Sequence, residues 1–322
     1  PVVASSGGNW TDRLIEAGVQ HVTLPLASKN PITMIRNIFA LRDLITSQGI
    51  DLVHARSRAP AWSAYFACKL AKVPFVTTFH GTYNFDDTFW GKWKKFYNSI
   101  MVRGDRVIAI SNFIKDHIHA HYGLYLDPEN LTVIHRGVDI NLFDPKKVTN
   151  DRLDVLKDRW RLPSYEHLLI LPARLTKWKG QLTFIGALSI LRKKGWNVTA
   201  VMMGHSQGRH EYLESLRYKM RNYHVEEFVV IDQACPDVPA AYRLAEIIIH
   251  ASTDPEAFGR VIVEAQAMGT PVIASNLGAP KEIIESGVNG YLFESGDPAD
   301  LAEKIELIFN MDAEKKTQMI KK

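Results

Sequence analysis

Cysteine is scarce in this chain of 322 residues, which has only Cys68 and Cys235. They lie far apart and form neither a C-x-x-C pair nor a Cys/His cluster, which argues against a disulfide framework and a zinc site. The sequence also lacks a run of about 18 or more uncharged apolar residues, so we expect no transmembrane helix. Its first residues, PVVASSGG, contain no charged and then apolar leader. We therefore expect a cytoplasmic protein with reduced thiols.

Two nucleotide-binding motifs are absent as well. No G-x-G-x-x-G segment opens a strand–helix unit, which disfavours a nicotinamide-dependent dehydrogenase, and no P-loop occurs. The net charge is only +4, from 39 basic and 35 acidic residues. This mild excess favours anionic ligands such as nucleotides, or an anionic membrane surface, and does not require nucleic acid as a partner.

Short apolar runs alternate with segments of helical length along the whole chain. Apolar residues recur with a period near 3.6 over 32–46, which predicts a helix there. Further helices are expected at 59–71, 89–101 and 112–122. Strands are expected at 51–55, 74–79, 106–110, 131–135, 168–172, 198–203, 228–231, 247–251, 271–274 and 291–293. Short, uniformly apolar strands separated by helices are typical of a buried parallel sheet.

These two successive series predict an α/β fold of two doubly wound, Rossmann-like domains. The break is expected near 136–139, with a polar linker at 144–149, which gives domains of 1–144 and 145–322. Ligands bind at the carboxyl ends of the strands in such open sheets. We therefore expect the two domains to face each other across a cleft that holds the active site.

Two basic residues follow the strand predicted at 168–172, in the segment ARLTKWKG. Arg174 and Lys179 precede a predicted helix start, whose free N–H groups and positive dipole end attract phosphate. Their guanidinium and ammonium groups would add positive charge there. Taken alone, a basic surface loop is the simpler interpretation.

Two glutamates, Glu256 and Glu264, bracket Phe258 and Gly259 in the segment PEAFGRVIVEA. Glu256 follows the strand predicted at 247–251, and Glu264 lies inside the next helix. Gly259 would let a ligand approach the backbone closely. One loop carboxylate and one helix carboxylate could hold two hydroxyl-bearing parts of one ligand, as a sugar nucleotide would offer. An unrelated loop glutamate and a solvated helix glutamate are the alternative interpretation.

Single polar residues follow two strands of the first series. His80 and Gly81 come after the strand at 74–79. A lone histidine there is more often packed or capping than catalytic, but the glycine beside it suggests close approach of a ligand to the backbone. Ser111, after the strand at 106–110, is interpreted mainly as the N-cap of the next helix.

Five segments of the chain share their order and spacing with a known family. They are FHGTY (79–83), AIS (109–111), HRGVD (135–139), ARLTKWKG (173–180) and PEAFGRVIVEA (255–265). Together they resemble the family 4 retaining glycosyltransferases of GT-B fold, over nearly the whole chain. HARSRAPAWSA (54–64) and VEAQAMGTPVIASNLGAPKEII (263–284) add a resemblance to bacterial members that build lipopolysaccharide core or other cell-envelope glycans.

The resemblance implies a set of donor-binding residues. Glu264 would bind the ribose hydroxyls of the donor. Phe258, Gly259 and Arg260 would lie along its sugar and diphosphate, largely through backbone N–H groups. The loop around Gly204 would lie near the nucleotide. The donor itself would be a UDP- or GDP-sugar, bound as a substrate, with no further cofactor.

The resemblance also implies four catalytic residues. His80 would lie near the reacting anomeric carbon, and Glu256 would face the donor hexose. Arg174 and Lys179 would neutralise the diphosphate as it leaves an oxocarbenium-like transition state. No Asp-x-Asp triad occurs in the chain, which disfavours a metal-dependent GT-A mechanism, so no metal is expected.

The implied acceptor is a glycan or a lipid-linked molecule. The segment FWGKWKKFY (89–97) interleaves aromatic residues with lysines, and family members with lipid-linked acceptors often dock on membranes through such a segment. This implies a peripheral position on the inner face of the cytoplasmic membrane. An ordinary amphipathic helix with lysines extended along its apolar side explains the segment equally well.

The chain departs from the family pattern at both ends. The usual first strand, with its glycine-rich loop, is not found, and the usual C-terminal helix that crosses back to the first domain is cut short at Lys322. A noncatalytic nucleotide-binding module is therefore an alternative. A sugar-nucleotide epimerase on a similar fold is another, and it would differ by turning over its nucleotide-sugar without an acceptor.

Overall fold

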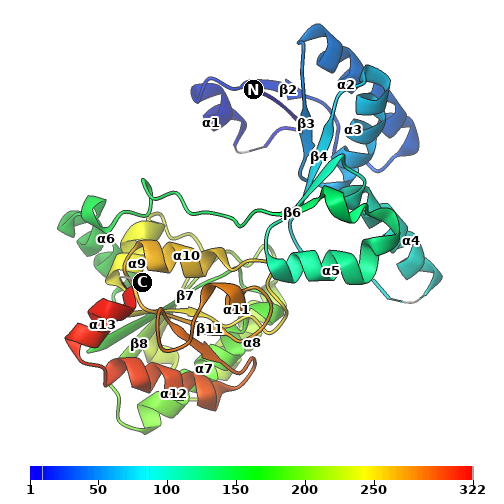
Figure 1. Cartoon of the computed structure of the whole chain (residues 1–322). Helices are drawn as coiled ribbons and strands as arrows, with labels where there is room; N and C mark the ends of the chain where they lie inside the picture. The colour runs from blue at the N-terminus through cyan, green and yellow to red at the C-terminus, as the bar shows by residue number, and fades with distance from the viewer. Residues whose placement is uncertain (9, 84, 87, 321–322) are drawn as a thin grey trace. The chain divides into compact units, whose positions relative to one another are not determined.

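The computed structural model describes residues 1–8, 10–83, 85–86 and 88–320. The chain divides into two compact units, Pro1–His135 and Arg136–Lys322, and each combines parallel β-sheet with α-helices (Figure 1). The division lies inside the HRGVD segment, ahead of the boundary predicted at 144. Within the described ranges, no helix has both the length and the apolar character needed to cross a membrane.

The first unit contains two parallel sheets. The smaller sheet pairs β1 (Val2–Ser5) with β2 (Gln20–Thr23). The larger sheet has the order β3-β4-β5-β6, with β3 (Val53–Ala55), β4 (Phe75–Phe79), β5 (Arg106–Ala109) and β6 (Leu131–Val133). The helices are α1 (Thr11–Glu16), α2 (Pro31–Ser47), α3 (Arg58–Ala71), α4 (Phe89–Asn98) and α5 (Asn112–Tyr122).

Local sequence explains where two of these helices begin. The side chain of Asn30 accepts a hydrogen bond from the backbone N–H of Ile32, and Pro31 occupies the first position of α2, where an N–H has no helical partner. The hydroxyl of Ser111 caps α5 by accepting from the N–H of Ile114 at 3.1 Å. The capping role expected for Ser111 is confirmed.

The second unit is built on six parallel strands in the order β12-β11-β10-β7-β8-β9. The strands are β7 (His167–Pro172), β8 (Val198–Met203), β9 (Val229–Asp232), β10 (Ile247–His250), β11 (Val272–Ser275) and β12 (Tyr291–Phe293). The helices are α6 (Asn150–Trp160), α7 (Gln181–Lys193), α8 (His210–Asn222), α9 (Val238–Leu244), α10 (Arg260–Ala267), α11 (Pro280–Ile283), α12 (Pro298–Phe309) and α13 (Ala313–Ile320). The strand order reverses between β7 and β10, which is where doubly wound sheets bind ligands.

Helices cover both faces of this sheet, which explains why its strands are uniformly apolar. Leu169 and Leu171 of β7 pack into one core with residues of α7 and α12. The alternate residues Leu168 and Ile170 pack into a second core with residues of α6, α9 and α10. Because successive side chains of a strand point to opposite faces, one short apolar run fills both cores.

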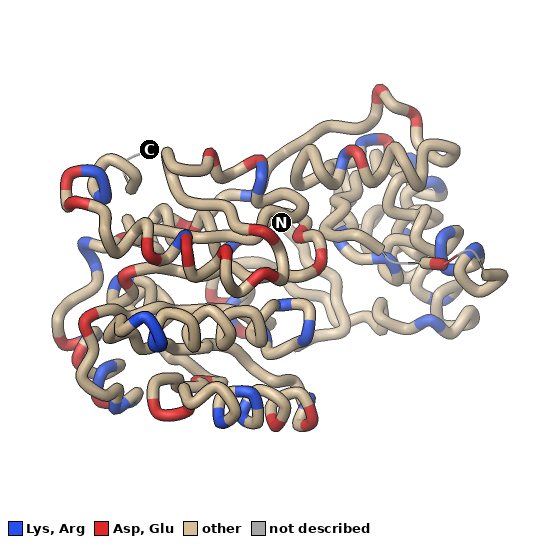
Figure 2. The backbone as a smooth tube through the Cα atoms, turned by 90° about the horizontal axis from the view of Figure 1, so that it is seen from below, with Lys and Arg blue, Asp and Glu red and all other residues tan. Residues whose placement is uncertain are grey.

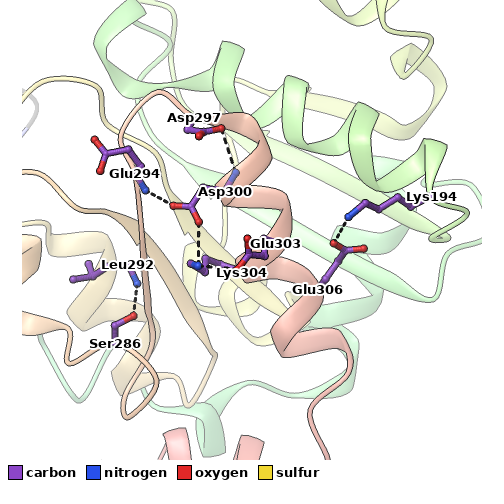
Figure 3. A network of polar contacts seen from close by, with 9 residues as sticks. All are labelled: Lys194, Ser286, Leu292, Glu294, Asp297, Asp300, Glu303, Lys304 and Glu306. Atoms are coloured by element: carbon purple, nitrogen blue, oxygen red, sulfur yellow. Dashed lines mark hydrogen bonds and ion pairs between the residues drawn. The ribbon is translucent and has the colours of Figure 1, made fainter.

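Charged residues of both signs are interspersed along the second unit (Figure 2). Several of them join its elements. Asp297 caps α12 by accepting from the N–H of Asp300 at 3.2 Å, and the Asp300 carboxylate accepts from the N–H of Glu294 at 2.6 Å (Figure 3). On the α7 side, Lys194 pairs with Glu306 at 2.6 Å. These contacts fix α12 between β12 and α7.

The predicted α/β class and the two Rossmann-like halves are confirmed. All ten predicted strands are present, with ends that differ from the predicted ones by at most two residues. The helix predicted over 89–101 ends as an α-helix at Asn98 and continues as a 3₁₀ turn over Ser99–Val102. Strands β1 and β2 are also present but were not predicted. That the two halves face each other across a cleft stays a prediction.

Asp232, at the end of β9, is a buried carboxylate that ties the sheet to α6. It accepts hydrogen bonds from Nε of Arg159 at 2.8 Å, Nε1 of Trp160 at 2.9 Å and the N–H of Ala234 at 3.0 Å. The hydrogen bond from Arg159 lowers the pKa of Asp232. Together with the other two it outweighs burial, which raises the pKa, and the value falls to about 2.

We expect Asp232→Ala to lower the free energy of unfolding at pH 7 by about 2–3 kcal/mol, because it removes hydrogen bonds to a charged group and leaves the Trp160 N–H unpaired. Since folding depresses this pKa, the contribution is complete above about pH 4 and is lost as the pH falls towards 2. Urea denaturation across this range measures it. Asp158→Ala, at an exposed position of α6, is the control. Equal losses in both variants would contradict the assignment.

Candidate functional site

The loops that follow β7 and β10 are packed together at the carboxyl edge of the second sheet. The two strands are neighbours in the sheet, so both loops leave it side by side. Gly180 has φ +71°, and a Cβ on it would lie 1.7 Å from the carbonyl oxygen of Ala251. The N–H of Thr253 donates to the carbonyl of Trp178 at 2.8 Å. Only glycine fits at position 180, and this packing brings the two predicted loops into contact.

Lys179 and Glu256 form an ion pair where these loops meet. The Nζ of Lys179 donates to Oε1 of Glu256, and each side chain is 15% exposed. The hydroxyl of Ser252 donates to the same oxygen at 2.9 Å, and Nε2 of His250 lies 3.6 Å from it. Three polar side chains therefore converge on one carboxylate oxygen.

The surroundings of Glu256 keep it ionised. Burial raises the pKa of this carboxyl, but the contact with His250 and the ammonium of Lys179 outweigh it and lower the pKa to about 2. Glu256 is therefore a fixed negative charge and a hydrogen-bond acceptor throughout the physiological range. Such a group can accept hydrogen bonds from ligand hydroxyls, and its cationic partner can be shared with a ligand anion.

Trp178 lies between the two basic residues of the first loop. The Nζ of Lys179 lies 4.1 Å from the centre of the indole, and the guanidinium carbon of Arg174 lies 5.7 Å from it. Arg174 is exposed, and its backbone is held by the side-chain amide of Gln181, which donates to the Arg174 carbonyl at 2.9 Å. The structure thus brings both predicted basic residues to one aromatic ring.

Gly259 immediately precedes α10 and Glu264 lies within it, and the helix starts at Arg260, shortly after Glu256. Gly259 adopts φ +91° just before the helix, and Phe258 is 5% exposed. The Glu264 side chain is 10% exposed. Its Oε2 accepts from the hydroxyl of Tyr242 at 3.0 Å and its Oε1 from a guanidinium nitrogen of Arg260 at 2.9 Å. The second predicted carboxylate is therefore also held by two donors.

Gly204 lies beside β7 on the side opposite to β10. It follows β8, and its N–H donates to the carbonyl of Asp232 at 2.9 Å. Its φ is +150°, and a Cβ on it would lie 2.1 Å from the carbonyl oxygen of Ala173. The loop after β8 therefore packs against the backbone immediately before Arg174.

His80 belongs to the first unit, where it follows β4. Nε of Arg56 approaches Nε2 of His80 at 3.4 Å, and the histidine is half-buried. The other predicted residues all lie in the second unit. The proximity of His80 to them stays a prediction.

Four residues of the site were not found from the sequence. His250 and Ser252 stand at the end of a buried strand, where polar residues are a usable signal. Trp178 sits inside a predicted loop, but its contacts with two cations depend on the loop's conformation. Tyr242 lies in an apolar helical segment and is indistinguishable there from a core residue. Among the described residues, no group of three or more His, Cys, Asp and Glu side chains is arranged to hold a metal ion.

Comparison with protein families gives two matches that divide the chain between them. Residues 2–142 match the model of glycosyltransferase family 4, and residues 154–322 match that of the glycosyl transferases group 1. The second match covers more than half of the chain.

Individual relatives agree with these matches. A crystallised glycosyltransferase from Rickettsia africae is 34% identical, with a TM-score of 0.90 over 100% of this chain and 83% of its own. A D-inositol 3-phosphate glycosyltransferase of Catenulispora acidiphila is 31% identical over 66% of this chain and 51% of its own length. Anabaena HepE, crystallised with UDP-glucose, is 24% identical with a TM-score of 0.83 over 99% of this chain and 84% of its own. The chain spans about half the length of the first curated relatives that it matches.

We expect Gly204→Ala to lower the free energy of unfolding by at least about 3 kcal/mol, because a methyl group there collides with the backbone of Ala173. Gly208→Ala is the matched control, since Gly208 also has a positive φ but no atom within 4 Å of the place where a Cβ would lie. It should cost only about 1–2 kcal/mol of backbone strain. Chemical denaturation of both variants measures the difference. Equal losses would show that the close approach is not what requires glycine at position 204.

Proposed function

Because the chain belongs to the glycosyl transferases of group 1, we propose that it is a retaining hexosyltransferase that uses a nucleoside diphosphate sugar as donor. The observation that carries this proposal is the convergence of Lys179, Glu256 and the start of α10 at the switch point of the second sheet. Cations, an ionised acceptor and free helical N–H groups are what a sugar diphosphate requires. His80, Arg174, Lys179 and Glu256 are the proposed catalytic residues.

The proposed reaction breaks the bond between the anomeric carbon and the diphosphate oxygen, and the electron pair leaves with the diphosphate. The acceptor hydroxyl forms the new bond on the same face of the sugar and gives its proton to the departing diphosphate. Lys179 and Arg174 stabilise the negative charge that builds on the leaving group. They supply this charge without a metal ion, and no carboxylate is assigned a covalent role.

Glu256 and Glu264 are proposed to hold the two ends of the donor. Glu256, ionised and close to Lys179, would accept hydrogen bonds from the hexose hydroxyls. Glu264, inside α10, would accept from the ribose hydroxyls. The diphosphate would lie between them along Phe258, Gly259 and Arg260, at the N-terminus of α10, since the N-terminus of a helix offers N–H groups and positive partial charge to an anion.

The proposed donor chemistry is tested by binding and turnover. Wild-type protein is titrated calorimetrically with UDP, GDP and their hexose conjugates, and transfer is followed on extracted glycan and lipid-linked acceptors. We expect Lys179→Met to lower kcat by about 10²–10³-fold, the usual loss when one group that stabilises transition-state charge is removed. Lys177→Met, at an exposed position of the same loop, should leave kcat within about twofold.

Further readouts separate this proposal from its alternatives. Product analysis by NMR should show the same anomeric configuration as the donor, and addition of EDTA should leave the rate unchanged. Release of an epimerised nucleotide-sugar without any acceptor would instead identify an epimerase. Nucleotide binding without transfer to any acceptor would identify a noncatalytic module. Failure of both UDP and GDP to bind would contradict the donor site itself.

We also propose a lipid-linked or glycan acceptor in cell-envelope or lipopolysaccharide synthesis, reached from a peripheral position on an anionic membrane. The support lies on one surface of the first unit. There Phe89, Trp90 and Trp93 of α4 are 77%, 73% and 58% exposed. A groove of about 540 Å³ beside them is lined by Trp62 and Phe96 among others, with Lys29 and Lys94 on its walls.

The charge of this surface is complementary to anionic lipid. The helices α2, α3 and α4 together carry seven lysines and arginines but one acidic residue, Asp43, which pairs with Arg42 at 2.6 Å. Exposed aromatic rings interleaved with lysines are the composition of helices that lie in a membrane interface. Each lysine near such a surface contributes about 1 kcal/mol, and salt screens it.

We expect the protein to sediment with phosphatidylcholine vesicles that contain phosphatidylglycerol, and less so as salt is raised. Replacing Trp90 and Trp93 together by alanine should lower the partition coefficient at least about tenfold, because two rings lose their burial in the interface. Trp10→Ala is the control, since Trp10 is 68% exposed in the same unit but outside this surface. Equal binding by the double variant and the control would contradict the proposed surface.

A further inference from the structure

Glu264 accepts hydrogen bonds from two donors at similar distances, one of them buried and the other exposed. The hydroxyl of Tyr242 donates to Oε2 at 3.0 Å, and Tyr242 is 0% exposed. Arg260 donates to Oε1 at 2.9 Å, but its side chain is 64% exposed. The contact from the buried side is fixed by packing. The contact from the solvent side joins an exposed side chain, and ion pairs of exposed side chains contribute little to stability.

Tyr242 belongs to α9 and is held in place by residues outside that helix. Its ring meets that of Phe143 edge to face, with centroids 5.8 Å apart. Its backbone carbonyl accepts from the hydroxyl of Thr270 at 2.8 Å. Burial, and then the charge of Glu264, raise the pKa of Tyr242 well above its ordinary value, so the phenol stays protonated and can only donate to the carboxylate.

We propose that Tyr242 is a positioning residue for the nucleoside end of the donor: its hydroxyl fixes Oε2 of Glu264, so that Oε1 is presented to the 2′- and 3′-hydroxyls of a ribose. This inference rests on the proposed function, and specifically on the ribose-binding role of Glu264. Arg260 contacts Oε1 in this structure, and because its side chain is largely exposed, a ribose can replace it there.

The physical gain lies in ordering the glutamate before the ligand arrives. A glutamate has three side-chain torsions, and fixing them on binding would cost free energy at that moment. The Tyr242 hydroxyl fixes them in the folded chain instead. The phenol itself does not reach solvent, so its effect on a ligand must pass through Glu264. That indirect action separates it from a residue that touches the nucleotide.

The experiment compares ribose with its hydroxyl-free analogue. The full chain is titrated calorimetrically with UDP and GDP and with the 2′,3′-dideoxy form of each. For the nucleotide that binds, the ratio of the dideoxy Kd to the ribose Kd reports the contribution of the hydroxyls. We expect Tyr242→Phe to lower this ratio about tenfold, because it weakens binding of the ribose nucleotide and leaves binding of the dideoxy nucleotide unchanged. Glu264→Gln should lower it at least as much.

Thr270→Val is the matched control for a merely structural role. It removes the hydrogen bond to the Tyr242 carbonyl and should lower the stability of the chain, but it leaves the phenol on Glu264 and should not change the ratio. Glu264→Asp is the second variant, which serves if Tyr242→Phe does not fold. It keeps the charge but draws the carboxylate back by one methylene from the phenol, so the ratio should fall as well.

Each outcome is decisive. If Glu264→Gln lowers the ratio and Tyr242→Phe does not, the positioning role is overturned while the ribose site stands. If Tyr242→Phe cannot be purified and Glu264→Asp keeps the full ratio, the placement of the carboxylate does not matter and the inference is overturned. If Glu264→Gln leaves the ratio unchanged, or neither UDP nor GDP binds, the proposed role of Glu264 fails and this inference falls with it.

Discussion

The backbone at Gly180 packs against the carbonyl of Ala251 so closely that a side chain at position 180 would overlap that oxygen. This contact joins the loop after β7 to the end of β10. The two strands are adjacent in the sheet, but their paired residues, such as Leu169 and Ile247, are 78 positions apart along the chain. It places Lys179 beside Glu256. Without it, the ammonium and the carboxylate would sit on two independent loops, and their ion pair would be an ordinary solvated one.

The two glutamates of the site are held in different ways, and the difference suits different ligand groups. Glu256 shares its Oε1 with an ammonium, a hydroxyl and a nearby imidazole. In the proposed reaction, an incoming diphosphate would compete with this carboxylate for Lys179, so the pair would rearrange as charge moved onto the leaving group. Glu264 has one oxygen anchored on a buried phenol. Because this phenol is buried, it would not follow the phosphates, and in the proposed site the carboxylate would keep its place while they bind and leave.

Much of this site could be predicted from the sequence, because its residues follow strands that are recognisable as buried apolar runs. Arg174, Lys179 and Glu256 were predicted at the ends of β7 and β10, and both strands were recognised from their Leu/Ile content. Their partners were not predicted. His250 and Ser252 act on Glu256 only because the chain turns back within a few residues. Tyr242 meets Glu264 across a contact between α9 and α10 that no period in either segment reveals. Hydrogen-bond partners depend on packing between segments, whereas strand positions depend on local composition.

Less of the chemistry of the first unit could be predicted from the sequence, because there too it depends on how separate segments pack. Its helices could be found from their periodicity, and α4 was recognised by its lysines and aromatic residues. The groove beside α4, however, is formed by α3 and α4 together with the start of α2. Trp62 of α3 lines it through a ring whose centre lies 5.6 Å from that of Phe96. An exposed apolar surface costs free energy in water unless something covers it. The sequence of α4 alone could not distinguish a covered helix from an open one, because that depends on how α2 and α3 pack beside it.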